Sequence, residues 1–202
     1  GGSACDMTPW IDQVSSVLCV WQPHQEGGNA IANVLLGNIC PSGKLPISFP
    51  RKLEDSPVHM LNNSSGRTYP NMKYTLLKSA KYEGTYMMKS QQHKDKLFDI
   101  HYDEGLYIGY RHFDKKQIEP LFPFGYGLSY TTFTIENIKA NANQITLKDK
   151  LSINATIKNT GKYAGAEVVQ VYFHDTECPV DRPTKELCAF QKVYLKPDEE
   201  KT

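Results

Sequence analysis

Residues 10–50 read WIDQVSSVLCVWQPHQEGGNAIANVLLGNICPSGKLPISFP and carry the clearest structural signals of the sequence. The run at 16–21 is short, apolar and rich in β-branched residues, which predicts a buried strand. After a polar loop, apolar residues recur with helical spacing over 26–36, and Gly37 follows where a helix-ending glycine belongs. A Pro-Ser-Gly turn and a brief extended segment complete 41–50. The order strand, loop, helix, strand indicates part of an α/β domain.

Two helix starts can be read from the same region. Thr8 before Pro9 predicts an N-cap and a short helix that runs from Trp10 to Val14. Glu26 is expected in the first turn of the second helix, where a carboxylate interacts well with the helix dipole. A carboxylate at a helix start is more often a capping residue than an acid catalyst, so Glu26 is a weak catalytic candidate.

The last third of the sequence has the pattern of β-strands. Apolar and polar residues alternate over 151–158, which predicts one buried and one wet face. Further strands are expected at 133–139, 167–174 and 186–195, the last with a bulge near Ala189. An immunoglobulin-like sandwich needs about seven strands, so these four predict an incomplete sandwich with an open sheet edge and an exposed apolar face.

A polar stretch separates the two patterns. Residues 51–103 are rich in Asn, Ser, Lys, Tyr and His and have weak periodicity, which indicates a long surface excursion. Its Asn62 and Asn63, together with Asn154 on the wet face of a predicted strand, begin N-x-[ST] sequons. These three asparagines are possible N-glycosylation sites if the protein is secreted.

Composition narrows the class of protein. Of the 202 residues, 40% are hydrophobic and 22% charged, and 23 Lys plus Arg against 22 Asp plus Glu leave a net charge of +1. We therefore expect a packed core, and we expect no nucleic-acid or membrane partner. No apolar run approaches the roughly 20 residues of a membrane-spanning helix. The opening GGSACDMTPW lacks an initiator Met and a signal-peptide pattern, which suggests a piece of a longer protein.

The cysteines predict no metal site, because none forms a C-x-x-C pair or lies near a His at zinc-ligand spacing. Cys5, Cys19 and Cys40 are expected as buried reduced thiols. Cys178 and Cys188 could instead close a short loop as a disulfide in an oxidising compartment. No nucleophile elbow or phosphate-binding loop is present, and the G-Y-G at 125–127 is expected to be a turn.

Taken together, several long motifs in order resemble one family. The sequence of 10–50, then YDEGLYIGYRHFD at 102–114, then LFPFGYGLSYTTF at 121–133 is similar to the C-terminal half of family 3 glycoside hydrolases. The segments at 157–173 and 182–202 resemble their fibronectin type III-like domain. The resemblance implies the C-terminal portion of an α/β sandwich domain at 1–130, with an insertion at about 51–103. It further implies a truncated fibronectin type III-like (immunoglobulin-like) β-sandwich at 131–202.

The family implies a retaining, exo-acting glycosidase of the β-glucosidase or β-xylosidase type, with no cofactor and a β-linked glucoside or oligosaccharide as substrate. A retaining mechanism uses two carboxyl groups about 5 Å apart. In the family, the nucleophilic Asp lies in an N-terminal domain, and the acid/base Glu precedes the segment that matches WQPHQEGGNA. Neither motif has a counterpart here, so no catalytic residue is assigned and no substrate-binding residue is known. We expect the chain to be inactive without the missing N-terminal domain, and to be partly disordered or aggregation-prone. Family habit suggests a secreted, lysosomal or periplasmic protein.

Two positions depart from the family pattern: His24 and Asp198 stand where many members carry Gly. In some members the variable insertion approaches the substrate, which makes Tyr74, Tyr82 and His93 conceivable rim contacts. The alternative function is a non-catalytic carbohydrate-binding or structural module. Its sugar-stacking candidates, each of which could equally pack between domains, are Trp21, Tyr107, Tyr110, Phe113, Tyr126 and Tyr130.

Overall fold

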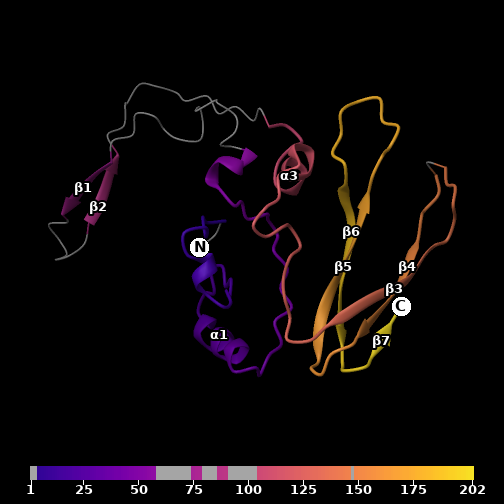
Figure 1. Ribbon diagram of the computed structural model, residues 1–202, viewed down its shortest axis with the longest axis horizontal. Helices are drawn as coiled ribbons and strands as arrows, with labels where there is room; N and C mark the ends of the chain where they lie inside the picture. Colours follow the sequence, from indigo (N-terminus) through magenta and orange to yellow (C-terminus); the bar gives the residue numbers. More distant parts are fainter. Residues whose placement is uncertain (1–3, 58–73, 79–85, 91–103, 147) are drawn as a thin grey trace.

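The computed structural model describes residues 4–57, 74–78, 86–90, 104–146 and 148–202, with the backbone alone at 74–78 and 86–90. Helical and irregular segments from both sides of the insertion form one part, and five strands near the C-terminus form the other (Figure 1). The elements are η1 (Ile11–Gln13), α1 (Gly27–Leu35), η2 (Leu53–Asp55), β1 (Tyr74–Lys78), β2 (Tyr86–Ser90), α3 (Tyr110–Lys116), β3 (Phe133–Ala140), β4 (Ile153–Asn159), β5 (Gly165–Phe173), β6 (Glu186–Leu195) and β7 (Glu200–Lys201).

The helix predicted around 26–36 is present as α1. Glu26 occupies its N-cap position, just before the first turn. Its carboxylate accepts a hydrogen bond from the side-chain NH₂ group of Asn29 at 2.7 Å. Leu36 ends the helix and Gly37 follows with φ +77°, so the expected helix-ending glycine is confirmed.

The prediction of a strand at 16–21 is wrong. This segment belongs to no strand, and Val17, Leu18 and Val20 are each about 40% exposed. Cys19 is exposed with them, against the expectation of a buried thiol, and so is Cys5. An apolar β-branched run indicates that side chains should be buried, but a strand also needs a neighbouring backbone to pair with. No sheet among the described residues includes 16–20.

The short helix after Pro9 is confirmed only as the single 3₁₀ turn η1. Thr8 does not cap it, because Trp10 occupies the N-cap position without a side-chain hydrogen bond. The Thr8 hydroxyl instead donates to the carbonyl of Arg51. This contact joins the start of the chain to the segment before η2, and a local capping rule cannot anticipate such a distant acceptor.

The extended segment at 45–49 runs antiparallel to 121–126. The Phe49 amide donates to the Phe122 carbonyl at 2.8 Å, and the Gly125 amide donates to the Leu45 carbonyl at 2.7 Å. Phe49 is almost fully buried and contacts the rings of Trp21 and Phe122. The G-Y-G motif does form a turn here. A Cβ on its Gly127 would lie 2.2 Å from the carbonyl oxygen of Gly43, so only glycine fits this close approach.

The C-terminal part contains the four predicted strands and a fifth short one. β3, β4 and β7 form one antiparallel sheet, and β5 and β6 form another. In the β5–β6 pair, Val171 faces Ala189 while Tyr172 faces Leu187, so Cys188 is the extra residue of a bulge. The bulge expected near Ala189 is therefore confirmed.

The two sheets meet around a fully buried amide. The Asn159 side-chain oxygen accepts from the Thr131 hydroxyl at 2.7 Å and from the Gly161 amide at 3.0 Å. Its NH₂ group donates to the carbonyls of Tyr163 and Leu195 at 2.8 and 3.2 Å. Every hydrogen-bonding position of this amide is thus used, which links the start of β3, the β4–β5 turn and the end of β6.

Away from this point the sheets diverge, as the β3–β4 and β5–β6 hairpins of Figure 1 show. Ile157, near Asn159, is buried, whereas Ile153 and Leu151 are exposed. The buried face predicted for 151–158 is therefore correct only at the C-terminal end of β4. Because the alternation gives the orientation of side chains but not the layer opposite them, the open apolar face appears where the second sheet is absent.

Candidate functional site

The most elaborate set of polar contacts lies where α3 meets the β5–β6 hairpin. Glu186 at the start of β6 pairs with Arg182 at 2.7 Å and with Arg111 of α3 at 3.8 Å. One helical turn along α3, Lys115 pairs with Asp181 in the loop between β5 and β6. Glu186 therefore lies between two cations, and α3 contributes one cation to each of these two carboxylates.

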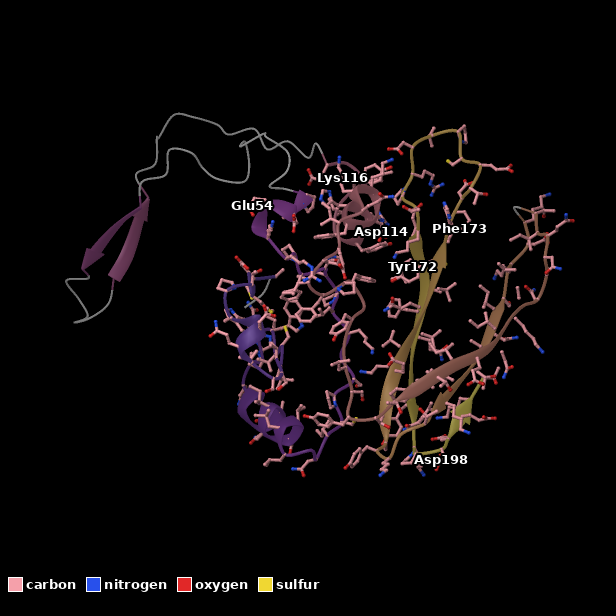
Figure 2. All side chains as sticks on the ribbon, in the orientation of Figure 1. Glu54, Asp114, Lys116, Tyr172, Phe173 and Asp198 are labelled. Carbon is pink, nitrogen blue, oxygen red and sulfur yellow. The ribbon has the colours of Figure 1, made fainter. Side chains whose placement is uncertain are left out.

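Aromatic side chains also connect α3 to β5 and β6. The Leu187 amide donates to the Tyr110 hydroxyl at 2.9 Å, and the Tyr110 ring lies edge-on to Tyr172 with centroids 5.9 Å apart. Figure 2 shows Asp114 of α3 beside Tyr172 of β5. Burial, and then the neighbouring Tyr110 and Asp114, raise the pKa of the Tyr172 phenol, so it stays neutral in the physiological range.

A second connection is a largely buried ion pair between Lys44 and Glu167 of β5. The ammonium lies 2.8 Å from the carboxylate and also donates to the Gly127 carbonyl at 2.6 Å. Both side chains are more than four-fifths buried, so the pair fixes the position of the 43–45 segment against the sandwich. The segment on each side of the insertion therefore contacts β5.

His112 holds α3 against the segment before the insertion. The imidazole is buried, and its Nε2 lies 3.1 Å from the carbonyl oxygen of Asp55. Since a carbonyl can only accept, Nε2 carries the proton. Burial is the main cause that lowers the pKa of His112, partly offset by this hydrogen bond, so the ring is neutral at pH 7.

The carboxylates with a described environment do not have the surroundings of a proton donor in catalysis. A general acid needs a raised pKa, whereas hydrogen bonds hold the pKa of Asp149, Asp181 and Glu199 below the ordinary value. Glu167 and Glu186 are committed to cations, and Glu26 to Asn29. Among the described residues there is also no cluster of His, Cys, Asp and Glu that could hold a metal ion. The arrangement is that of a structural junction.

The predicted site residues are scattered. Asn154 lies exposed on β4, while Asn62, Asn63, Tyr82 and His93 fall outside the described residues, and of Tyr74 only the backbone is described. All these assignments therefore stay predictions. The aromatic candidates divide: Phe113 is buried, and Trp21, Tyr110 and Tyr126 contact other rings, as packing residues do. Tyr107 lies beneath the Lys115 ammonium, and Tyr130 keeps nearly half its surface exposed.

The disulfide considered for Cys178 and Cys188 is absent, because both thiols are free and the Cys188 sulfur contacts the Val171 carbonyl. No helix among the described segments is long and apolar enough to cross a membrane. Sequence reasoning missed the Lys44–Glu167 pair and the role of Asn159. Only the turn chemistry at 159–162 signalled the second of these.

Comparison with known proteins gives consistent matches. A model described as the glycosyl hydrolase family 3 C-terminal domain matches residues 1–130, and one described as a fibronectin type III-like domain matches 167–202. A β-glucosidase of Bacteroides ovatus is 40% identical over 200 residues, which cover 99% of this chain and 23% of that protein. β-Glucosidase B of Emericella nidulans is 42% identical over 197 residues, which cover 96% of this chain and 20% of that protein.

A solved structure of β-glucosidase 3B from Thermotoga neapolitana, in complex with α-D-glucose, superposes with a TM-score of 0.76 at 35% identity. The match covers 98% of this chain and 24% of that one. The predicted fold class, an α/β portion followed by a fibronectin type III-like sandwich, is thereby confirmed. The chain spans about a fifth to a quarter of the length of the relatives it matches.

Proposed function

The chain belongs to glycosyl hydrolase family 3, and from this premise we propose that it forms part of a β-glucosidase whose catalytic carboxylates lie elsewhere in the polypeptide. The reaction is the retaining, exo-acting hydrolysis of a β-linked glucoside. The described part of this chain supplies a scaffold for that reaction, through α1, the α3 junction and the sandwich. Secretion, or a lysosomal or periplasmic location, goes with this proposal.

One observation carries most of the proposal: residues 16–20 belong to no strand of the described chain, and their apolar side chains Val17, Leu18 and Val20 are each about 40% exposed. Such a segment is stable when a neighbouring strand pairs with its backbone and a second layer covers its side chains. The relatives, four to five times longer, have sequence that could supply both. The same additional sequence would contribute the nucleophilic Asp and the acid/base Glu.

A chimaera tests the proposal directly. This chain would replace the 200 matching residues of the Bacteroides ovatus β-glucosidase, and hydrolysis of p-nitrophenyl β-glucoside would be measured. We expect a rate within about tenfold of the parent enzyme, equivalent to about 1.4 kcal/mol in the barrier. The 202-residue chain alone should show no turnover, and neither should the parent enzyme with those residues deleted.

The matched control substrate is p-nitrophenyl α-glucoside, which the chimaera should leave intact. Gel filtration and thermal unfolding would first establish that the chimaera is folded. A folded chimaera without β-glucosidase activity would contradict the proposal, as would turnover by the isolated chain at the rate of a complete enzyme.

A further inference from the structure

A crevice with an unusual lining lies between the end of α1 and the sandwich. Its volume is about 960 Å³, and its walls come from residues 36–42, from Tyr130, from the β4–β5 turn and from β6. Three tyrosines line it: Tyr130, Tyr163 and Tyr194, which are 47%, 60% and 58% exposed. The crevice is large enough for a ligand of drug size or above.

The part of the crevice wall that carries the tyrosines is fixed at several points. The Tyr130 hydroxyl donates to the Val34 carbonyl of α1 at 3.0 Å, which fixes this ring at its far end. Tyr163 is held through its carbonyl by the buried Asn159 amide, and Tyr194 precedes the fully buried Leu195 on β6. A ligand here would therefore meet one anchored ring and a fixed backbone at the other two positions, which limits the ordering cost of binding.

The remaining lining defines the chemistry of the ligand. No lining residue carries a charge, which disfavours phosphates, nucleotides and charged peptides. Asn38 and Ser42 add a side-chain amide, which also donates to the Asn33 side chain at 3.2 Å, and a hydroxyl group to the lining. Aromatic faces beside neutral hydrogen-bonding groups suit a pyranose, which has an apolar C–H face and a rim of hydroxyls.

We propose that this crevice is a non-catalytic binding site for a β-linked gluco-oligosaccharide, with Tyr163 and Tyr194 as its stacking residues. The choice of a β-glucan as the sugar rests on the proposed function, whereas the neutral, aromatic character of the site does not. Cover by another segment of a longer polypeptide is the competing occupant. The lining favours the sugar, because it combines three tyrosine rings with neutral groups only.

Binding of cellotetraose to the full 202-residue chain, measured by calorimetry, tests the site. We expect saturable binding with a Kd of about 1 mM or tighter. Tyr163→Ala and Tyr194→Ala should each weaken it about three- to tenfold, as loss of a stacking partner does. Tyr163→Phe keeps the ring and should retain most of the affinity. Maltotetraose, the α-linked counterpart, should bind more weakly.

The matched control is Phe190→Ala, which removes an exposed aromatic side chain of β6 that does not line the crevice. It should leave the affinity unchanged, and far-UV circular dichroism should be the same for all variants. The absence of saturable binding would overturn the proposal, and so would equal affinities for wild type and both alanine variants. An active chimaera with no sugar binding at this crevice would overturn this inference alone. Sugar binding beside an inactive, folded chimaera would leave it standing and contradict the proposed function.

Discussion

The two parts of the molecule differ in how completely they satisfy their own backbone and side chains. The sandwich buries Leu195, Ile157 and the Asn159 amide, and the amide finds all its partners within the same part. The N-terminal part instead exposes the apolar segment 16–21, which has the composition of a buried strand. The closed end of the sandwich thus satisfies its buried groups within its own strands and turns, whereas apolar side chains of the N-terminal part have no covering layer among the described residues.

The largest effect is expected where the sandwich is most self-sufficient. Asn159→Ala removes four side-chain hydrogen bonds and leaves buried groups, including the Thr131 hydroxyl, without partners. Each such group costs about 1–3 kcal/mol, so the free energy of unfolding should fall by about 3 kcal/mol or more. Urea unfolding followed by fluorescence measures this loss.

Asn154→Ala is the matched control, because Asn154 lies exposed on the same strand. It should change stability by less than about 0.5 kcal/mol. If the two variants were equally stable, the closed end of the sandwich would not depend on the amide.

The next effect distinguishes the two parts by context. In the isolated chain, Leu18→Ala should cost less than about 0.5 kcal/mol because the side chain is exposed. In the chimaera with the longer relative, the same substitution should cost about 2–3 kcal/mol, since Leu18 would there be buried. Ile157→Ala, within the sandwich, should cost the same in both contexts. Thermal unfolding of the four variants would settle whether 16–21 becomes a core strand.

How far sequence could predict these differences depends on the range of the interactions. The period of α1 and its Gly37 are local, as is the alternation in β4, so these elements were predictable. Whether residues 16–20 pair as a strand was not predictable, because strand pairing requires a separate segment of chain. The central role of Asn159 escaped prediction since its partners come from separate loops and strands, and single tyrosines such as Tyr163 carry no pattern at all.

A third, smaller effect concerns pH and the N-terminal part. Because the pKa of His112 is lowered by burial, the unfolded chain binds a proton more readily than the folded one. Stability should therefore be full above pH about 6.5 and fall progressively below it. His112→Gln, which keeps a donor for the Asp55 carbonyl, should lessen this dependence.

The measurement is the midpoint of urea unfolding between pH 5 and 8. The neighbouring variant Phe113→Leu is the control, because it should lower stability at every pH without changing the slope. An unchanged slope in His112→Gln would exclude the imidazole as its source.

The junction between the parts should respond to salt. Glu186→Gln removes the carboxylate that pairs with Arg182 and Arg111, and should cost about 0.5–1 kcal/mol at low ionic strength. The cost should shrink at 0.5 M NaCl, where the Debye length is about 4 Å. Glu200→Gln, an exposed carboxylate on β7, should have little effect at either concentration. A cost independent of salt would assign the role of Glu186 to packing.

The smallest expected effect is a gain in stability, at the two positions where this chain departs from the family glycine. His24 has φ +53° and Asp198 has φ +60°, so both adopt the left-handed backbone that glycine favours. Asp198, labelled at one end of the sandwich in Figure 2, follows Pro197 in a turn closed by the Glu199 amide on the Lys196 carbonyl. Proline followed by a residue with positive φ is the pattern of a type II turn. Glycine relieves strain at such a position but adds freedom to the unfolded chain, so the two effects partly cancel. Asp198→Gly should therefore stabilise the sandwich by about 0.5 kcal/mol, whereas Asp198→Val should destabilise it by about 1 kcal/mol.

His24→Gly should likewise stabilise the protein, but its gain will be visible only when the N-terminal part unfolds together with the sandwich. Thermal unfolding of both glycine variants thus also reports whether the two parts are one cooperative unit. A loss of stability in Asp198→Gly would show that the aspartate side chain contributes more than its backbone strain costs.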